Sequence, residues 1–200
     1  MNKATLAGKI IDIEFSNEFN GEKFYKAILE VARNSGNTDK IPCIIPDVLR
    51  NGLEVGCFTT FFGEIRTRSY YGDDEKKHLD VHMFVKDVAE FTVYLNTVEL
   101  EGFICKEPIY RETPLGRQIC DFFVAVNRRH GKSDYIPSIS WGRDSLRVGM
   151  MKVGDKVSIH GRLQSREYEK KVNDFEYKTK TAYELSVSKV GRVEECKESE

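Results

Sequence analysis

The segment Leu29-Glu-Val-Ala-Arg-Asn-Ser-Gly-Asn-Thr-Asp-Lys-Ile-Pro42 aligns without a gap with Val124-Ala-Val-Asn-Arg-Arg-His-Gly-Lys-Ser-Asp-Tyr-Ile-Pro137, at an offset of 95 residues. Further along, Gly63-Glu-Ile-Arg-Thr-Arg-Ser-Tyr70 matches Gly161-Arg-Leu-Gln-Ser-Arg-Glu-Tyr168, now at an offset of 98 residues. A period this long is typical of a duplicated domain, because the repeats of solenoids are shorter. The chain is therefore predicted to hold two copies of one domain.

The repeat divides the chain into two domains of similar size. We expect a first domain at residues 1–93, a second at 94–191 and a short acidic tail at 192–200. Two hundred residues, 40% of them apolar and 32% charged, are enough for two small hydrophobic cores. Almost no linker separates the two copies, so the sequence predicts tandem domains.

Alternation of apolar and polar residues predicts strands within each copy. Val157, Ile159 and Leu163 alternate with polar residues, which indicates a strand with one buried face. Gly161 interrupts this series, and a glycine inside a strand allows a tight bend or a close approach of another backbone. Further strands are expected in the second copy at 97–104, 117–129, 134–141 and 175–190, with one short helix at 142–151, and in the first copy at 4–13, 23–33, 39–45, 57–71 and 78–91, with a short connector at 46–51.

Five strands with a short helix after the third are the order of an OB-fold, a partly open five-stranded barrel that often binds oligonucleotides. The predicted fold class is all-β, with two tandem OB-fold five-stranded barrels and a short helix after the third strand. No apolar stretch is long enough to span a membrane, and the first eight residues lack the build of a secretory signal. We therefore expect a cytoplasmic protein without a membrane partner.

Charge is unevenly distributed along the chain. Residues 1–95 hold 12 Lys and Arg against 15 Asp and Glu, whereas residues 96–200 hold 19 against 17. The last eight residues contain four glutamates and one lysine, so the rest of the second half is basic. Clustered Lys and Arg are what the neutralisation of phosphates requires. This distribution indicates a basic segment that could contact nucleic acid, followed by an acidic tail.

Six motifs of the second copy carry a family resemblance. They are Asn96-x-Val98-x-Leu100-x-Gly102, Pro108-x-x-Arg111-x-Thr113-Pro114-x-Gly116, Phe123-Val-Ala-Val-Asn127-Arg128, Asp134-Tyr-Ile-Pro137, Trp141-Gly142-Arg143 and Gly161-Arg-Leu-Gln-Ser-Arg166-x-Tyr168. With these motifs the second copy resembles the bacterial single-stranded DNA-binding protein family along nearly all of residues 96–190. The resemblance implies that bases stack on the side chains of Tyr135, Trp141, Tyr168 and His130.

The residues of the second copy support the same mechanism. Arg162, Gln164, Arg166 and Tyr168 share parity, so on a strand they project from the face opposite Val157. A row of cations ending in an aromatic residue suits sequence-tolerant binding of single strands, because every base has a π-face and every phosphate a charge. Other cations expected to follow the phosphate backbone are Arg128, Arg129 and Lys132 in the neighbouring loop and Arg143 beside Trp141.

The first copy carries fewer of these residues. Tyr70 alone matches one of the aromatic positions, that of Tyr168, and Arg68 lies near it on the same predicted strand. We expect weak binding there, and a main role of the first copy in assembly or in lengthening the path of the bound strand. At the positions of His130, Tyr135 and Trp141 the first copy has Ser35, Lys40 and Pro46.

No catalytic machinery is visible in the sequence. There is no phosphate-binding glycine loop, Gly-x-Ser-x-Gly elbow or His-Glu-x-x-His helix. His78 and His82 share a strand face but have no third ligand nearby, and five cysteines without a Cys-x-x-Cys spacing indicate neither a zinc site nor a disulfide framework. We expect a non-enzymatic protein with no metal and no cofactor, although an enzyme built from scattered acids stays open.

The expected function is sequence-tolerant binding and protection of single-stranded DNA in replication, recombination or repair, with RNA still open. Family members with one barrel form tetramers, which implies a homodimer with four barrels here. The family usually ends in an acidic segment tipped by Pro-Phe that recruits repair and replication proteins, but this chain ends Glu194-Glu-Cys-Lys-Glu-Ser-Glu200. The bacterial cytoplasm, with nucleoid association or a phage or mobile-element origin, is the expected setting. The alternative is an OB-fold interaction module of a replication-restart or recombination complex, which binds a protein first.

Overall fold

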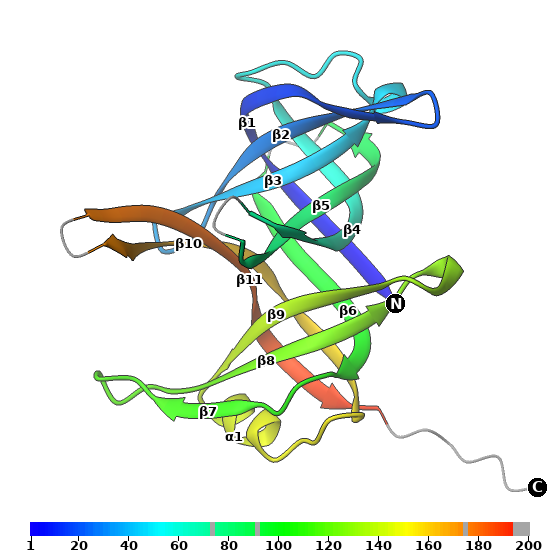
Figure 1. Cartoon of the computed structure of the whole chain (residues 1–200). Coiled ribbons are helices and arrows are strands. Elements are labelled where there is room, and N and C mark those ends of the chain that lie inside the picture. The colour runs from blue at the N-terminus through cyan, green and yellow to red at the C-terminus, as the bar shows by residue number, and fades with distance from the viewer. Residues whose placement is uncertain (73–74, 91–92, 174–175, 194–200) are drawn as a thin grey trace, which may run out of the picture. The chain divides into compact units, whose positions relative to one another are not determined.

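The computed structural model describes residues 1–72, 75–90, 93–173 and 176–193, without the side chains of residues 130, 170–173 and 176. Almost all of the secondary structure is β (Figure 1), so the prediction of a β protein is confirmed at this level. The described chain forms two compact units. One consists of Lys3–Thr97 and Leu163–Glu184, and the other of Met1–Asn2, Val98–Arg162 and the described residues from Leu185 onward.

The first five strands form a closed barrel. Their order is β2-β3-β5-β4-β1, and β1 pairs again with β2 to close the ring. All pairings printed on the two sides of β4 are antiparallel, whereas β3 and β5 run parallel. A 3-10 helix, η1 (Asp47–Leu49), follows the third strand. The strands are β1 (Asn2–Phe19), β2 (Glu22–Ala32), β3 (Thr38–Pro46), β4 (Phe58–Tyr71) and β5 (Lys77–Ala89).

Six further strands follow, and five of them repeat the same pairings. Their order is β6-β10-β11-β9-β8-β7, with an additional pairing of β6 with β8, and β9 and β11 run parallel as β3 and β5 do. The arrangement is consistent with tandem OB-folds. The elements are β6 (Leu95–Ile104), β7 (Ile109–Glu112), β8 (Gln118–Asn127), η2 (Arg129–Gly131), β9 (Ser133–Trp141), α1 (Arg143–Gly149), β10 (Lys156–Asn173) and β11 (Glu176–Arg192).

The alternation of the sequence builds one apolar core inside each set of strands. In β2 of the first barrel, Ala27, Leu29 and Val31 are buried and the residues between them are partly exposed, because successive side chains of a strand point to opposite faces. The same holds in the second set. The largest fully buried side chains are Leu6, Ile10, Leu29, Ile41, Ile45, Phe61, Ile65 and Met83 in the first and Leu100, Ile104, Phe122 and Ile136 in the second.

Two glycines at equivalent positions of the repeat allow strands to approach closely. A Cβ atom added to Gly161 would lie 2.4 Å from the carbonyl oxygen of Ser186, and one added to Gly63 would lie 2.0 Å from that of Phe84. Such distances leave no room for a side chain, so the close backbone approach predicted for Gly161 is present. The first barrel needs the same device at Gly63, which the sequence repeat places in register with Gly161.

Several elements differ from the sequence-based expectation. Strand β1 continues to Phe19 and forms a long hairpin with β2, because Asn20 and Gly21 both adopt positive φ angles at the turn. Strand β7 was not predicted, and the short helix of the first copy is a single turn of 3-10 helix. Within the described residues, the helices are too short or too polar to cross a lipid bilayer.

Candidate nucleic-acid interface

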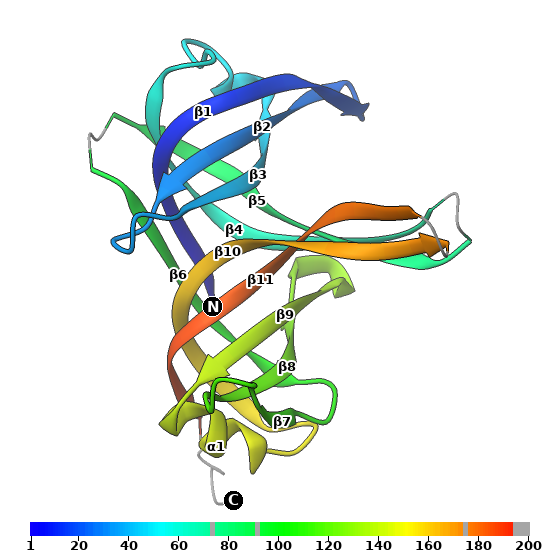
Figure 2. The same ribbon diagram turned by 90° about the vertical axis from the view of Figure 1, so that its left-hand side faces the viewer.

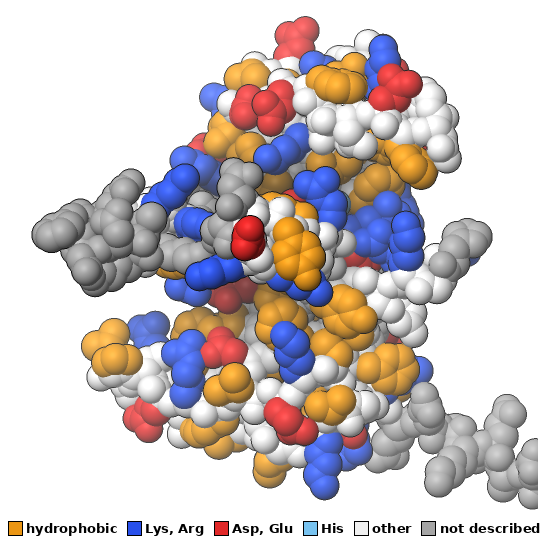
Figure 3. Space-filling model, in the orientation of Figure 1, with side chains coloured by type: hydrophobic (Ala, Val, Ile, Leu, Met, Phe, Trp, Pro, Cys, Tyr) orange, Lys and Arg blue, Asp and Glu red, His pale blue; other side chains and the backbone are white. Residues whose placement is uncertain are grey.

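The outward face of β9 carries two of the predicted aromatic residues. Asp134, Ile136 and the following even-numbered residues of the strand are buried, and of the alternating odd-numbered residues Tyr135 and Trp141 are exposed whereas Ile139 is covered. Tyr135 is 48% exposed and Trp141 is 40% exposed, and they lie six residues apart, about 20 Å along an extended strand. This spacing leaves room for several nucleotides between the two rings. Hydrophobic and basic side chains together cover this part of the surface (Figure 3).

The end of β9 fixes the position of Trp141. Gly142 has φ 57° and ψ −128°, a conformation that favours glycine. Its N–H donates to the carbonyl oxygen of Gln118 at 2.9 Å, and its own carbonyl accepts a hydrogen bond from the Ser145 hydroxyl at 2.6 Å. Trp141 therefore lies between a strand pairing and the first turn of α1, and both hold its backbone.

Replacing Gly142 with alanine is expected to lower the free energy of unfolding by about 1–3 kcal/mol, because the added Cβ strains this backbone conformation. Urea denaturation of the two proteins measures the difference. Gly191→Ala is the matched control, since an added Cβ there meets nothing within 4 Å and the backbone is ordinary. Equal losses in both variants would contradict the assignment of strain to Gly142.

The loop between β8 and β9 is held by an ion pair. Arg128 donates from Nε to Oδ2 of Asp134 at 2.5 Å and from Nη2 to Oδ1, and the Asp134 carboxylate is fully buried. The Arg128 N–H also donates to the carbonyl oxygen of Lys132 at 2.7 Å. The first barrel has the same pair, Arg33 with Asp39, at the equivalent positions. Arg128 thus shapes the loop, and its contact with phosphates remains a prediction.

The other predicted cations of this unit lie on its surface. Arg129 and Lys132 are exposed in the loop, and Arg143 is exposed at the start of α1. Arg162 is partly buried beside Gly161 on β10. The side chain of His130 lies outside the described part of the structure, so its predicted stacking role stays a prediction.

The two remaining predicted aromatic residues each form a pair with an arginine. Arg166 Cζ lies 5.8 Å from the centroid of the Tyr168 ring, and Arg68 Cζ lies 5.7 Å from that of Tyr70. Both tyrosines are about two-fifths exposed, Tyr168 at 39% and Tyr70 at 41%. Tyr70 also stacks on His78, with ring centroids 5.4 Å apart. The repeat therefore preserves one arginine and tyrosine pair in each copy.

Acidic residues accompany these arginines. Arg68 Nη2 lies 3.1 Å from Asp80 Oδ2, and Arg166 Nε lies 3.8 Å from Glu184 Oε1. The Arg68 pair is exposed and contributes little to stability, so a phosphate can compete for its guanidinium, whereas in the other pair Glu184 is only 15% exposed. Gln164 and Arg166 both contact Glu184 Oε1, Gln164 by a hydrogen bond of 2.8 Å, so they lie on one face of β10, but Gln164 is buried. Parity gives the shared face but not the burial, because Glu184, the partner of Gln164 on β11, lies 20 residues away in the sequence.

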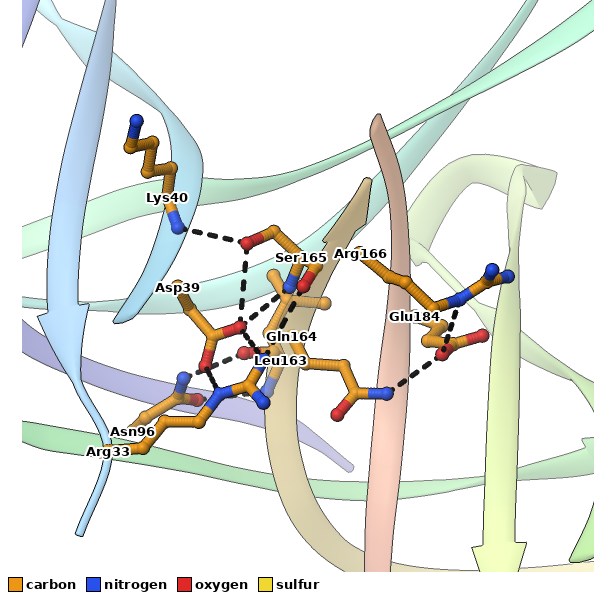
Figure 4. Close-up of polar contacts among 9 residues, drawn as sticks. All are labelled: Arg33, Asp39, Lys40, Asn96, Leu163, Gln164, Ser165, Arg166 and Glu184. Carbon is orange, nitrogen blue, oxygen red and sulfur yellow. Dashed lines mark hydrogen bonds and ion pairs between the residues drawn. The ribbon is translucent and has the colours of Figure 1, made fainter. Parts of the chain in front are cut away.

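Strand β10 is fastened to β3 near these residues (Figure 4). The buried carboxylate of Asp39 accepts hydrogen bonds from Arg33 and, at 2.8 Å, from the N–H of Ser165. In return the N–H of Lys40 donates to Ser165 Oγ at 3.0 Å. This set, which we call the Asp39 clamp, holds β10 three residues before Tyr168. Figure 2 shows the ends of β10 and β11 alongside those of β4 and β5 in the same unit.

A second pair of hydrogen bonds joins β10 to the start of β6. The Asn96 side chain donates from Nδ2 to the carbonyl oxygen of Leu163 at 2.7 Å and accepts from the Leu163 N–H at 2.9 Å. Tyr183 on the neighbouring β11 has a raised pKa, because burial and then the Asp80 carboxylate oppose its ionisation. Sequence reasoning quoted Asn96 within a motif but gave it no role. Its side chain makes the two hydrogen bonds that a paired strand would make, and such a contact leaves no periodic signal in the sequence.

Sequence reasoning also missed two surface residues beside the aromatic pair of β9. Phe123 pairs with Pro137 across β8 and β9, and Lys106 Nζ lies 4.4 Å from the centroid of its ring. Arg111 on β7 donates from Nε to Asp121 Oδ2 at 2.7 Å. Phe123 and Arg111 both lie in the quoted motifs. The available signal was that Asp121 and Phe123 are two residues apart on one strand, so their side chains share a face. They enlarge the outward surface on which Tyr135 lies.

The described residues give no sign of a metal centre. No group of three or more His, Cys, Asp or Glu that could hold a metal ion occurs within them. Burial and then Asp121 raise the pKa of the Cys120 thiol to about 11, and burial raises that of Cys43. Both thiols are therefore protonated and unreactive near neutral pH. Cys196 in the acidic tail lies outside the described residues.

Comparison with known proteins extends these observations. The model of the Single-strand binding protein family matches residues 95–193. Single-stranded DNA-binding protein A of Bacillus subtilis is 37% identical over 82 residues, which are 38% of this chain and 48% of that protein. The corresponding protein of Clostridium tetani is 35% identical over 92 residues, or 42% and 63% of the two. The chain thus spans about half to two thirds of the length of these curated relatives.

Solved structures show the same fold over the whole chain. The crystal structure of the wild-type single-stranded DNA binding protein from Thermus aquaticus superposes with a TM-score of 0.77 at 20% identity, covering 100% of this chain and 96% of that one. A deletion mutant of the same protein gives a TM-score of 0.75 at 19% identity. The matched family consists of non-enzymatic DNA-binding proteins, which agrees with the expectation that this protein is not an enzyme. By its residues 95–193, the chain belongs to the single-strand binding protein family.

Proposed function

We propose that this protein binds and protects single-stranded DNA, with little sequence preference, during replication, recombination or repair. One observation carries the proposal: Tyr135 and Trp141 are both exposed on the outward face of one strand. A stacked base contributes about 1–3 kcal/mol by alanine substitution, and stacking tolerates any base because each has a π-face. The relatives named for single-stranded DNA binding support the choice of ligand.

Cations around the aromatic residues would hold the phosphates. Arg129, Lys132 and Arg143 are exposed near the two ends of β9, in the same unit as Tyr135 and Trp141. Each phosphate neutralised on a single strand makes the fall of log affinity with log salt concentration steeper by about 0.7. We further propose that Arg162, the Arg166 and Tyr168 pair and the Arg68 and Tyr70 pair contact the same ligand, while Arg128 acts mainly by shaping its loop.

Titration of the protein with oligothymidine tests the proposal, because the single tryptophan lies at a proposed stacking position. We expect tryptophan fluorescence to be quenched to saturation, with an affinity that falls between 50 mM and 300 mM salt, and without a matching effect of duplex DNA. The same titration with oligouridine compares RNA. Unchanged fluorescence together with no shifted band in a gel would contradict single-strand binding and favour a protein-binding module.

The proposed assembly has two OB-folds in each chain. We propose the domains 1–93 and 94–191, an acidic tail at 192–200, and a homodimer that brings four barrels together in a bacterial cytoplasm. Sedimentation equilibrium tests the dimer, since it reports twice the mass of the chain if the proposal is correct. Replication or repair proteins remain proposed partners, and the end of the tail lies outside the described residues.

A further inference from the structure

The outward face of the first barrel carries two aromatic residues that the repeat did not reveal, beside Arg66 of the aligned segment. This barrel has Lys40 and Pro46 where the second has its two exposed aromatic residues on β9. Three other side chains project from the same face, namely Phe24 on β2, Arg66 on β4 and Phe84 on β5. The loss of two aromatic positions is thus accompanied by aromatic residues elsewhere.

The strand pairings establish that these side chains point outward. Phe84 is partly exposed, whereas its neighbours Met83 and Val85 are fully buried in the core. In register, Phe84 pairs with Ile44 of β3 and with Glu64 of β4, which are also only partly buried. Paired residues of adjacent strands share a face of the sheet. The set therefore lies across neighbouring strands on the outside of the barrel.

The three side chains form a layered contact. The rings of Phe24 and Phe84 have centroids 6.2 Å apart at an interplanar angle of 45°, and Arg66 Cζ lies 3.6 Å from the centroid of Phe84. Arg66 also lies 3.3 Å from Glu64, but its Nε atom is buried and has no hydrogen-bond partner among the described residues. Its side chain as a whole remains 24% exposed.

The second barrel lacks this set. By the strand registers, Phe24 corresponds to Ile119 of the second barrel and Phe84 corresponds to Ser186. By the sequence repeat, Arg66 corresponds to Gln164. None of these offers an aromatic ring or a guanidinium. The layered contact is therefore a property of the first barrel and not an inherited part of the repeat.

The surroundings of the set are basic. Lys26 pairs with Ile44 on the same face and is exposed, and the exposed Lys40 side chain points away from the Asp39 clamp (Figure 4). Burial raises the pKa of Glu64, but Lys86 and Arg66 together lower it below its usual value. The Glu64 carboxylate is therefore ionised and neutralised by two cations, and a second acidic residue of the face, Glu30, pairs with Lys40. The remaining positive charge suits phosphates on either side of a stacked base.

We propose that Phe24, Arg66 and Phe84 form a base-stacking platform of the first barrel, which takes a base of single-stranded DNA while Lys26 and Lys40 contact the flanking phosphates. The guanidinium carbon already lies over the Phe84 ring, so a base can stack beside it without further ordering of the side chain. This inference rests on the proposed function and adds a second, independent contact to it. On the first barrel it adds a base-stacking position to the contact already proposed for the Arg68 and Tyr70 pair.

Crosslinking and affinity measurements on the full chain test the platform. Ultraviolet irradiation of the protein with a long oligothymidine is expected to attach thymine to peptides that contain Phe24 or Phe84. Arg66→Gln gives the first barrel the residue of the second, and Phe84→Leu removes the ring while keeping the position apolar. Each is expected to weaken binding of long oligothymidine about 5- to 10-fold, the lower part of the range for one lost stack.

Phe15→Leu is the matched control, since Phe15 is 56% exposed on β1 and packs on Tyr25 instead of the platform. Unchanged affinity of both platform variants, with no crosslink to β2 or β5, would overturn the inference while tryptophan quenching still supports the proposed function. Absence of quenching by any oligonucleotide would remove the proposed function itself. An altered sedimentation of Arg66→Gln without any change in DNA binding would identify the face as a contact between copies and overturn the platform.

Discussion

Replacing Trp141 with leucine is expected to weaken binding of oligothymidine by about 5- to 150-fold, the equivalent of about 1–3 kcal/mol for one lost base stack. Leucine keeps an apolar side chain at the end of β9, so the strand and α1 are expected to stay intact. The aromatic plane is lost, however, and with it the contact that any base can use. Fluorescence anisotropy of a labelled oligonucleotide measures the change, because the variant has no tryptophan.

Trp141→Phe is the matched variant for this experiment. Phenylalanine restores a π-face at the same place, so we expect an affinity within about threefold of the original. The two substitutions remove the same indole but differ in aromatic character. Equal losses in both would show that the size or the N–H group of Trp141 matters and would contradict stacking as its role.

Replacing Asp39 with asparagine is expected to lower the free energy of unfolding by about 3 kcal/mol, because it leaves the Arg33 guanidinium without its buried partner. The same change releases the N–H of Ser165 from its carboxylate acceptor. The end of β10 that carries Arg166 and Tyr168 then loses the Asp39 clamp. Urea denaturation measures the loss of stability, and protease cleavage within residues 163–184 measures the release of the hairpin.

Asp134→Asn is the matched control, since Asp134 forms the equivalent pair with Arg128 in the other unit. It is expected to cost similar stability without exposing residues 163–184 to protease. Ser165→Ala gives a milder test, in which the amide of Lys40 exchanges its hydrogen faster because its acceptor is gone. Protection of that amide in Ser165→Ala, or cleavage of the hairpin in both aspartate variants, would refute a specific role of the clamp.

Repetition and parity were sufficient to predict much of the fold. The aligned segments around Arg33 and Arg128 predicted two similar sets of strands, because the same residues form the same loop in each copy. Parity predicted that Tyr135 faces outward, since a strand alternates its side chains. The close approach at Gly161 also has a local cause, because the sequence itself shows a glycine, which has no side chain, at this position.

Other features depend on partners far away along the chain. Strand β7 consists of four exposed residues, so no alternation marked it. The burial of Gln164 accompanies a hydrogen bond to Glu184 on another strand. The contact between Arg66 and Phe84 joins β4 and β5. The periodicity of a sequence does not reveal how two strands are aligned with each other. The division of the structure, with Leu163–Glu184 in the unit of the first barrel, arises from contacts that span 125 or more residues.

The Asp39 clamp has a consequence for biosynthesis. Asp39 leaves the ribosome well before Ser165, which follows it by 126 residues. At about 5–20 residues per second, the delay is roughly 6–25 seconds, long enough for a small barrel to fold. During that interval the nascent first barrel has Arg33 but lacks the donor that Ser165 later supplies. This contact thus arrives only after most of the second copy has been translated.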